Sequence, residues 1–506
     1  MNSKKKWTRS LVRGAVVIPL LVVLASCNDW TQFRGGADHT GFNQSEAVIN
    51  SSNVSSVVVK GTSSVAGAPT TAGAIHSSPV VFGTTVYVTS RGENHVSPEI
   101  KGSLFAYSAD GSRGCSGTPL VCSPLWSATP GGALSASPAV ATIAGTNHTV
   151  VYVASSGGEV TAYDAAGSTS CSSTPVVCTP LWTSGPIGGS IAGSLTISGN
   201  YLYVSTVYGA TYAFDTAAAF NSDPSICEPR RIDGGAYVEQ CHWEWVDRTP
   251  GDVFASPTVS NGVLYSAADL ATGETLYAFD ATTDSGQHCT GVVNSTKTCS
   301  PIWTSTPWDA GSSTTAVANG IAYIGSLKSG LLAFDATGLS ASNCTGTAYV
   351  KRVCSPLWVA NTGNQAGSSP AVANGIVYIG AADGKLYAFD ATTGNPLWTA
   401  ATGGPIESSP TVAGGASGAS SGQVVYVGSD DNSLYAFDAN GSTNCSTLLF
   451  QLKTCTPLWS YATGGAIESS PSVVDWKANQ NPPGGVAVGA IYVGSDDNKL
   501  YGFGLP

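Results

Sequence analysis

Charged side chains are scarce in this 506-residue chain, because Asp, Glu, Lys and Arg together make up only 10% of it. Basic residues are the scarcer sign, with 21 Lys and Arg against 32 Asp and Glu, and the formal net charge is −11. A chain of this kind lacks the basic patch through which proteins bind nucleic acid or anionic lipid. Nucleic acid is therefore excluded as a partner.

Residues that favour helices are also few, with 1 Met against 60 Gly. Residues 367–398, GSSPAVANGIVYIGAADGKLYAFDATTGNPLW, show what takes their place. Short runs of alternating β-type residues are separated by Asp, Gly, Asn and Pro, which is typical of strands joined by tight hairpins. The chain offers no convincing set of a nucleophile and its base, so nothing supports a hydrolase with a nucleophile elbow. The sequence predicts an all-β protein.

The same pattern recurs eight times along the chain. The copies begin at His76, Ser135, Ile191, Phe254, Ser312, Gly367, Glu407 and Glu468. A fixed spacing of twelve residues joins the final Trp of one copy to the Ser-Pro position of the next: Trp126/Pro138, Trp182/Ser194, Trp245/Pro257, Trp303/Thr315, Trp358/Pro370, Trp398/Pro410 and Trp459/Pro471. Repeats of roughly 40–60 residues with four strand signals predict a β-propeller of eight four-stranded blades. SSPxV is the innermost strand, followed by VYVGS, LYAFD and PLW.

The ends of the chain predict how the ring closes. The last copy stops at Pro506 without a PLW strand, and residues 54–64, VSSVVVKGTSS, form an unassigned β-type run ahead of the first copy. We expect this N-terminal strand to complete the last blade and remove its open edge. The alternative is a linker. One propeller domain then spans residues 28–506.

The first 27 residues have the pattern of a lipoprotein signal peptide. Basic residues precede a short apolar run, Ala15 to Leu24, which ends in Leu-Ala-Ser-Cys27 and so resembles a bacterial lipobox. Lipidation of Cys27 would anchor the chain to a membrane at the bacterial cell envelope, on its periplasmic or extracellular face. Losing the five basic residues at positions 4, 5, 6, 9 and 13 would take the formal charge from −11 to −16. A plain secretory signal is the alternative.

The other twelve cysteines fall into six neighbouring pairs. They are Cys115/Cys122, Cys171/Cys178, Cys227/Cys241, Cys289/Cys299, Cys344/Cys354 and Cys445/Cys455. Each pair lies between a third strand and the following Trp strand, where two Cys can meet across a hairpin and stay bonded in an oxidising compartment. The sixth copy has a short turn and no pair. Zinc is the weaker alternative, because no CxxC occurs and His is rare.

Two features interrupt the repeat. The first is an insert in the third copy, residues 227–252, where charged and aromatic residues gather in a charge-poor chain. We predict that it forms a recognition surface, with these residues as its candidates: Arg230, Arg231, His242, Trp243, Glu244 and Trp245. A solvated hairpin with internally paired charges is the alternative.

The second feature is the position three residues before each Ser-Pro, which should face the mouth of the central channel. Once the ring closes, His76, Glu407 and Glu468 come from adjacent blades. Such a cluster could bind a divalent cation, with Glu407 and Glu468 as the metal ligands, or support acid–base chemistry. Local capping by each Glu is the alternative. The runs 430–432 (Asp-Asp-Asn) and 496–498 (Asp-Asp-Asn) are assigned to the hairpin turns between second and third strands, which Asp, Asn and Gly suit, and calcium ligation is their alternative.

The repeat NGIVYIGAADGKLYAFDATTGNPLW resembles that of the pyrroloquinoline-quinone (PQQ) propellers, which include quinoprotein alcohol dehydrogenases and the outer-membrane assembly lipoprotein BamB. Residues 29–36, DWTQFRGG, and 39–41, HTG, resemble their N-terminal segment, and hairpins ending in CTPLW or CSPLW resemble polyvinyl-alcohol dehydrogenase-like members. The resemblance implies PQQ and calcium as cofactors of an enzymatic member. This chain has no Cys-Cys dipeptide and no CxxCH haem motif.

Two functions follow. We favour a membrane-anchored, monomeric propeller that binds protein or polymer partners. The alternative is a PQQ-dependent alcohol or polyvinyl-alcohol dehydrogenase that uses an external electron acceptor. Neither a substrate nor a catalytic residue is assigned from the sequence.

Overall fold

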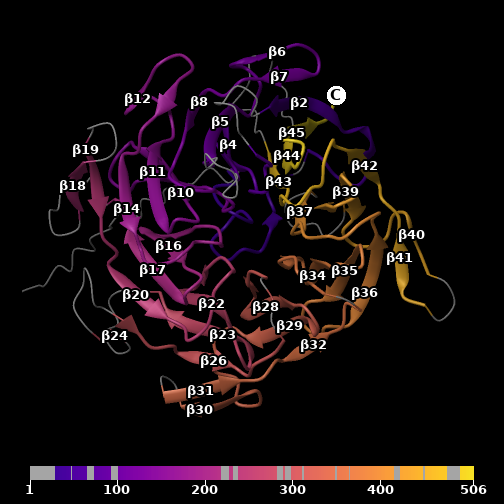
Figure 1. Cartoon of the computed structure of the whole chain (residues 1–506). Coiled ribbons are helices and arrows are strands. Elements are labelled where there is room, and N and C mark those ends of the chain that lie inside the picture. Colours follow the sequence, from indigo (N-terminus) through magenta and orange to yellow (C-terminus); the bar gives the residue numbers. More distant parts are fainter. Residues whose placement is uncertain are drawn as a thin grey trace, which may run out of the picture.

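The computed structural model of the chain is a closed ring of β-sheets around a central axis (Figure 1). It describes residues 29–46, 48–64, 73–92, 101–217, 227–231, 237–281, 289–290, 298–309, 311, 313–347, 350–363, 365–414, 422–447, 451–475 and 490–506. The predicted signal peptide and Cys27 lie outside these residues. Within them no helix has the length and hydropathy needed to cross a membrane.

Eight blades of four antiparallel strands make up the ring, as the repeats predict. The innermost strands are β3 (Val80–Phe82), β9 (Ala139–Thr142), β15 (Thr196–Ser198), β21 (Thr258–Ser260), β27 (Ala316–Ala318), β33 (Ala371–Ala373), β37 (Thr411–Ala413) and β43 (Ser472–Val474). The second strands are β4 (Thr85–Ser90), β10 (Thr149–Ala154), β16 (Tyr201–Ser205), β22 (Val263–Leu270), β28 (Ile321–Ser326), β34 (Ile376–Gly380), β38 (Val424–Gly428) and β44 (Ala490–Ser495).

The third strands are β5 (Ser103–Ser108), β11 (Glu159–Asp164), β17 (Ala210–Asp215), β23 (Gly273–Asp280), β29 (Gly330–Asp335), β35 (Lys385–Asp390), β39 (Ser433–Asp438) and β45 (Lys499–Gly504). The outer strands are β8 (Trp126–Ala128), β14 (Trp182–Pro186), β20 (Trp245–Arg248), β26 (Trp303–Ser305), β32 (Trp358–Ala360), β36 (Pro396–Ala401), β42 (Trp459–Ala462) and, for the last blade, β2 (Val58–Ser64). Strand β2 pairs antiparallel with β45, which confirms the predicted closure by an N-terminal strand. A 3₁₀ turn, η1 (Val54–Ser56), precedes it.

All six predicted disulfides are formed, each across a two-stranded hairpin. The hairpins are β6 (Cys115–Ser116) with β7 (Leu120–Cys122), β12 (Cys171–Ser172) with β13 (Val177–Cys178), β18 (Cys227–Arg231) with β19 (Tyr237–Cys241), β24 (Cys289–Thr290) with β25 (Thr298–Cys299), β30 (Cys344–Thr347) with β31 (Val350–Cys354), and β40 (Cys445–Ser446) with β41 (Lys453–Cys455). Their second strands pair in parallel with the outer strand of the preceding blade, so six of the sheets have six strands. The sequence does not predict this extension.

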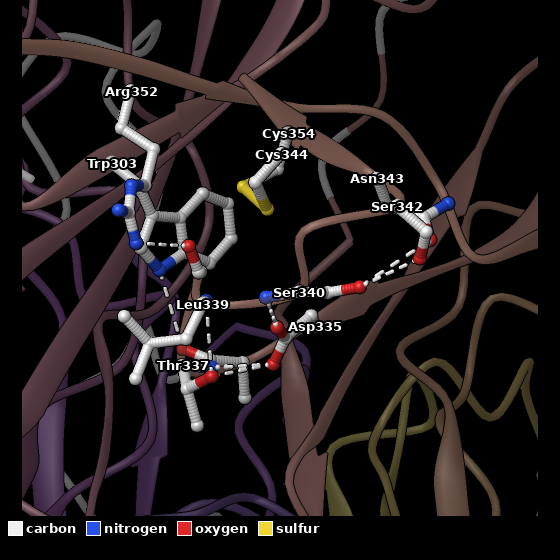
Figure 2. The surroundings of a disulfide bond; sticks show 12 residues. Trp303, Asp335, Thr337, Leu339, Ser340, Ser342, Asn343, Cys344, Arg352 and Cys354 are labelled. Atoms are coloured by element: carbon white, nitrogen blue, oxygen red, sulfur yellow. Dashed lines mark hydrogen bonds between the residues drawn. A yellow bond between two sulfur atoms is a disulfide. The ribbon is translucent and has the colours of Figure 1, made fainter. Parts of the chain in front are cut away.

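Hydrogen bonds at the base of a hairpin fix its course (Figure 2). Asp335 ends β29 and accepts the backbone N–H groups of Thr337 and Ser340, at 3.0 and 2.6 Å. Arg352 of β31 donates to the carbonyl oxygen of Gly338 at 2.7 Å. The turn after the third strand is therefore tied to the hairpin that leaves the blade.

Neighbouring blades are joined by a repeated pair of aromatic donors. In the first blade, the Tyr87 hydroxyl and the Trp126 indole N–H both donate to the carbonyl oxygen of Ala165 in the second blade, at 2.9 and 3.1 Å. Tyr265 and Trp303 share the carbonyl of Ala336 in the same way. The repeat therefore places its Tyr and Trp where each blade contacts the next, and both rings are buried there.

Candidate functional site

A closed ring of hydrogen bonds forms the wall of the central channel. In each blade a backbone N–H donates to the hydroxyl of the Ser or Thr at the same position in the next blade, at 2.9 to 3.1 Å. The eight residues are Ser78, Ser137, Ser194, Ser256, Thr314, Ser369, Ser409 and Ser470, and the last of them donates to the first. The hydroxyl of the repeated Ser-Pro motif is thus the contact that holds the inner strands at a common height.

The N-terminal segment closes one end of this channel. Its backbone or side chains form hydrogen bonds to the eight blades in order: Trp30 to Val81, Thr31 to Val140, Gln32 to Ile197, Ala37 to Val259, Asp38 to Val317, Thr40 to Val372, Gly41 to Val412 and Asn43 to Val473. The two-residue strand β1 (Phe42–Asn43) continues this path alongside β37. We call residues 30–43 the plug.

Arg34 lies at the centre of the plug and is only 2% exposed. Its guanidinium donates to the carbonyl oxygens of His39, Ser369 and Pro410, at 2.9, 3.2 and 3.3 Å, and also to that of Pro370. Burial lowers the pKa of Arg34 to about 9, which still leaves it charged at neutral pH. Four backbone carbonyls therefore stand in for a carboxylate partner.

Above the plug the channel is a blind well of about 200 Å³. Phe33 of the plug forms its floor, the hydroxyl ring forms its wall, and His76, Glu407 and Glu468 lie at its open mouth together with Ser135, Ala192, Phe254 and Gly367. Six of the eight predicted mouth positions therefore line the well. Ser312 lies outside the described residues.

The prediction that Ile191 faces the channel mouth is wrong. Ile191 is buried in a hydrophobic cluster, and Ala192 lines the well in its place. The cause is a β-bulge between β11 and β14, where Glu159 and Thr161 face Pro186 and Thr183. The bulge adds one residue to the outer strand, so the constant twelve-residue spacing fails in the third blade.

His76 is held between two carboxylates at the seam where the ring closes. Its Nδ1 lies 2.6 Å from Glu468 Oε2, and its Nε2 lies 3.2 Å from Asp496 Oδ1. The hydrogen bond to Glu468 and both negative charges raise the pKa of His76, while the same bond lowers the pKa of Glu468. His76 and Glu468 therefore lie side by side, as the closed ring predicts. Asp496 is a third residue in contact with His76.

Glu407 belongs to a second group of carboxylates at the mouth. Partial burial raises the pKa of Asp430 to about 6, with further contributions from the charges of Glu407, Glu468 and Asp496. The part of the shift that comes from these neighbours shows that their negative charges act on Asp430. Among the described residues, Arg91 also acts at this rim, because its positive charge lowers the pKa of Glu468.

Within each Asp-Asp pair the two residues have different roles. Asp431 accepts the N–H of Ser433 at 2.9 Å and the hydroxyl of Tyr435 at 2.6 Å, which confirms the turn assignment. Asp497 likewise accepts the hydroxyl of Tyr501. The preceding residues, Asp430 and Asp496, face the channel mouth instead. The sequence-based prediction assigned both Asp of each run to the turn rather than to a cation site, which is wrong for the side chain of Asp496, because it lies with His76 and Glu468.

The third-blade insert is one of the six disulfide hairpins, and β19 pairs with β14 of the second blade. Arg230 and Arg231 belong to β18. The Nε2 atom of His242 lies 3.9 Å from Oε1 of Glu228. Glu244 accepts a hydrogen bond from the hydroxyl of Tyr201. Trp243 packs edge-on against Tyr212, and Trp245 is 1% exposed in β20, so Trp245 contributes to the core and not to a surface. The role of the insert in recognition stays a prediction.

The mouth does not fit PQQ, the cofactor that this kind of propeller suggests. PQQ is a tricarboxylate, and the mouth presents the four carboxylates of Glu407, Asp430, Glu468 and Asp496 against two cations. His76 is already paired with two of them, and Arg34 lies below the floor with its donors bonded to carbonyls. A divalent cation fits better, because His76, Glu468 and Asp496 offer ligand atoms within 4.8 Å of one another. Glu407 is not part of that group.

Fold and site together define an eight-bladed β-propeller with a plugged channel and an acidic mouth. The family model of the outer membrane protein assembly factor BamB matches residues 41–222 and 350–502, well over half of the chain. The protein therefore belongs to the BamB family of PQQ-like propellers. No curated protein matches its sequence.

Solved structures show the same fold at low identity. BamB from Moraxella catarrhalis is 15% identical with a TM-score of 0.50, covering 88% of this chain and 97% of that one. A europium-containing methanol dehydrogenase is 14% identical with a TM-score of 0.54, covering 95% and 99%. The quinohemoprotein alcohol dehydrogenase ADHIIG from Pseudomonas putida HK5 is 14% identical with a TM-score of 0.56, covering 95% and 80%. These likenesses concern the fold, which both binders and enzymes share.

Proposed function

We propose that this protein is an exported, lipid-anchored binding propeller that holds its acidic channel mouth away from the membrane and binds a cationic segment of a protein partner there. The observation that carries this proposal is the asymmetry of the channel, closed at the end where the chain enters and open at the end that carries the carboxylates.

The position of the anchor supports this orientation. Asp29 accepts the N–H of Gly83 in the turn that follows β3, on the face opposite the mouth. Cys27 is two positions before Asp29, so the two residues are at most about 7 Å apart. A lipid on Cys27 would therefore hold the plugged face near the membrane. The six disulfides agree with export to an oxidising compartment.

The mouth has the charge that a cationic partner needs. A Lys or Arg side chain entering the well would meet Glu407 and Asp430 at the rim and the hydroxyl ring below. Binding would also offset the repulsion from Glu407, Glu468 and Asp496 that adds to burial in raising the pKa of Asp430. Charges at such a rim act mainly on the rate of association and on its salt dependence.

Calorimetry with an octalysine peptide at low ionic strength tests the proposal. We expect binding that weakens with added salt and that falls several-fold in the double variant Glu407→Gln, Asp430→Asn. Glu228→Gln is the matched control, because Glu228 is an exposed acid on a hairpin far from the axis. Equal binding by the double variant and the control would overturn the role of the mouth.

Two further measurements separate the remaining functions. Metabolic labelling with a fatty acid should mark the full-length chain and not Cys27→Ser; labelling of neither would leave a soluble exported protein. Addition of PQQ with calcium should neither raise the melting temperature nor support dye reduction with short alcohols or polyvinyl alcohol. Stabilisation with dye turnover would establish a quinoprotein dehydrogenase instead.

A further inference from the structure

The outer edge of most blades is covered by a strand of the same chain. Six outer strands pair in parallel with the second strand of a disulfide hairpin: β2 with β7, β8 with β13, β14 with β19, β20 with β25, β26 with β31 and β36 with β41. Figure 1 shows hairpins β30–β31 and β40–β41 on the outside of the ring. The arrangement protects edges that would otherwise present unpaired N–H and C=O groups.

Blade five departs from this arrangement. Its sheet, β27–β28–β29–β32, has four strands, and among the described residues no strand pairs with the outer side of β32. The reason is local: the hairpin would have to come from the sixth blade, where a short turn after Asp390 leads directly into β36. The uncovered edge of blade five lies between the fourth and sixth blades, whose outer edges are covered (Figure 1).

The uncovered edge of β32 is apolar. Val359 is 53% exposed and Leu357 at the start of the strand is 36% exposed. Val359 also borders a hollow of about 730 Å³ that is lined by Leu332, Pro356 and Trp308 among others. Strand β32 contains neither a charged residue nor Pro, the usual means by which natural edge strands avoid pairing.

Strand β42 is the other outer strand that pairs with no hairpin among the described residues. Unlike β32, it contacts the segment that precedes β2. The indole N–H of Trp459 donates to the carbonyl of Val57 at 3.0 Å, and Val54 and Val57 pack in the same hydrophobic cluster. Its outward residue Ser460 is polar and exposed. Strand β42 is therefore a suitable comparison rather than a second site.

We propose that the edge of β32 binds an extended segment of a partner protein as a parallel β-strand. The other blades define the geometry of that strand. Residues one and three positions after the outer Trp turn their N–H groups outward: Ser127 donates to Val176 at 3.0 Å and Thr306 donates to Cys354 at 2.8 Å. The equivalent donors of blade five are the N–H groups of Val359 and Asn361.

The buried side chain of the covering strand specifies part of the partner's chemistry. The second Cys of each hairpin, such as Cys354 or Cys455, is buried against the blade it covers. The partner strand would therefore present a small apolar residue at that position and β-branched residues beside it, as in β13 (Val177–Cys178). Main-chain hydrogen bonds would supply affinity, and this side-chain pattern would supply specificity.

A synthetic disulfide-closed hairpin that copies residues 444–457 is the probe, because in the intact protein this hairpin covers the equivalent edge of β36. Labelled with a fluorophore, it should bind the full-length protein in an anisotropy titration. Val359→Pro removes one outward N–H and should weaken binding roughly tenfold. Ser460→Pro on β42 is the matched control and should leave the affinity unchanged.

Val359→Lys serves as a second variant, because it needs no change in the backbone and should weaken binding similarly. Protection of the Val359 and Asn361 amides from hydrogen exchange on adding the probe would place it at this edge. Absence of binding, or equal loss in the Ser460→Pro control, would overturn the proposal. A dimer of the protein that dissociates in Val359→Lys would also overturn it, since a second copy would then be the occupant.

Discussion

Removing one hydroxyl from the channel ring is the sharpest test of how the blades are held together. In Ser409→Ala the backbone N–H of Ser369 loses its acceptor, which lies 3.0 Å away in the wild type. Both residues are buried, and a buried donor left unsatisfied costs about 1–3 kcal/mol. With an unfolding entropy of about 2.1 cal/mol/K per residue, a chain of this length has roughly 1 kcal/mol/K in total, so we expect the melting temperature to fall by about 1–3 °C.

The chain itself supplies the control. Thr314 holds the same position in the fifth blade and accepts the N–H of Ser256 at 3.1 Å, so Ser409→Thr should keep the bond and nearly the full stability. Calorimetry gives the melting temperatures, and hydrogen exchange reports the Ser369 amide, which should exchange faster only in Ser409→Ala. Wild-type stability and unchanged protection of Ser369 in Ser409→Ala would refute the view that the hydroxyl ring joins the blades.

Three other predictions concern the plug, the mouth and the hairpins. Arg34→Met leaves four buried carbonyl groups without a donor and should cost about 3 kcal/mol or more in a denaturant titration; a smaller loss than Ser409→Ala would contradict the central role of Arg34. The raised pKa of His76 gives stability that is present below its ordinary value of 6.5 and is lost as pH rises above it, so the melting temperature should fall above pH 6.5. Ionising Asp430, whose pKa is raised from 3.8 to about 6, costs stability that is lost between those two values, so Asp430→Asn should raise the melting temperature at pH 8. Replacing both Cys445 and Cys455 by Ser opens a short loop and should cost about 2–3 kcal/mol, seen as a lower denaturant midpoint.

The repeat was sufficient to predict the ring, its blade number and the six disulfides, because each of these depends on a local pattern that recurs. Among the described residues, the twelve-residue spacing also predicts which positions reach the mouth, except in the third blade, where a bulge in β14 adds a residue. The bulge contains Gly185, whose φ of 63° is of the kind that favours glycine, but a chain with 60 Gly does not distinguish it by sequence alone.

Contacts between distant segments were beyond the sequence. Nothing near Asp496 indicates that it faces His76, since the two meet only across the seam of the closed ring. The docking of each hairpin on the preceding blade was missed for the same reason, because its partner strand lies in another repeat. Arg34 lies in residues 29–36, which only the resemblance to PQQ propellers singles out. Its guanidinium bonds to carbonyl oxygens more than 300 positions away, which no local pattern predicts.

The plug has a consequence for how the protein reaches its native state. Residues 30–43 are the first described part of the chain to be synthesised, yet Asn43 bonds to Val473, 430 positions later. Their binding site does not exist until the eighth blade is in place. Nearly the whole chain must therefore lose its loop-closure entropy before these contacts can stabilise the fold. We therefore expect the plug to reach its native position last, after a ring of eight blades has formed.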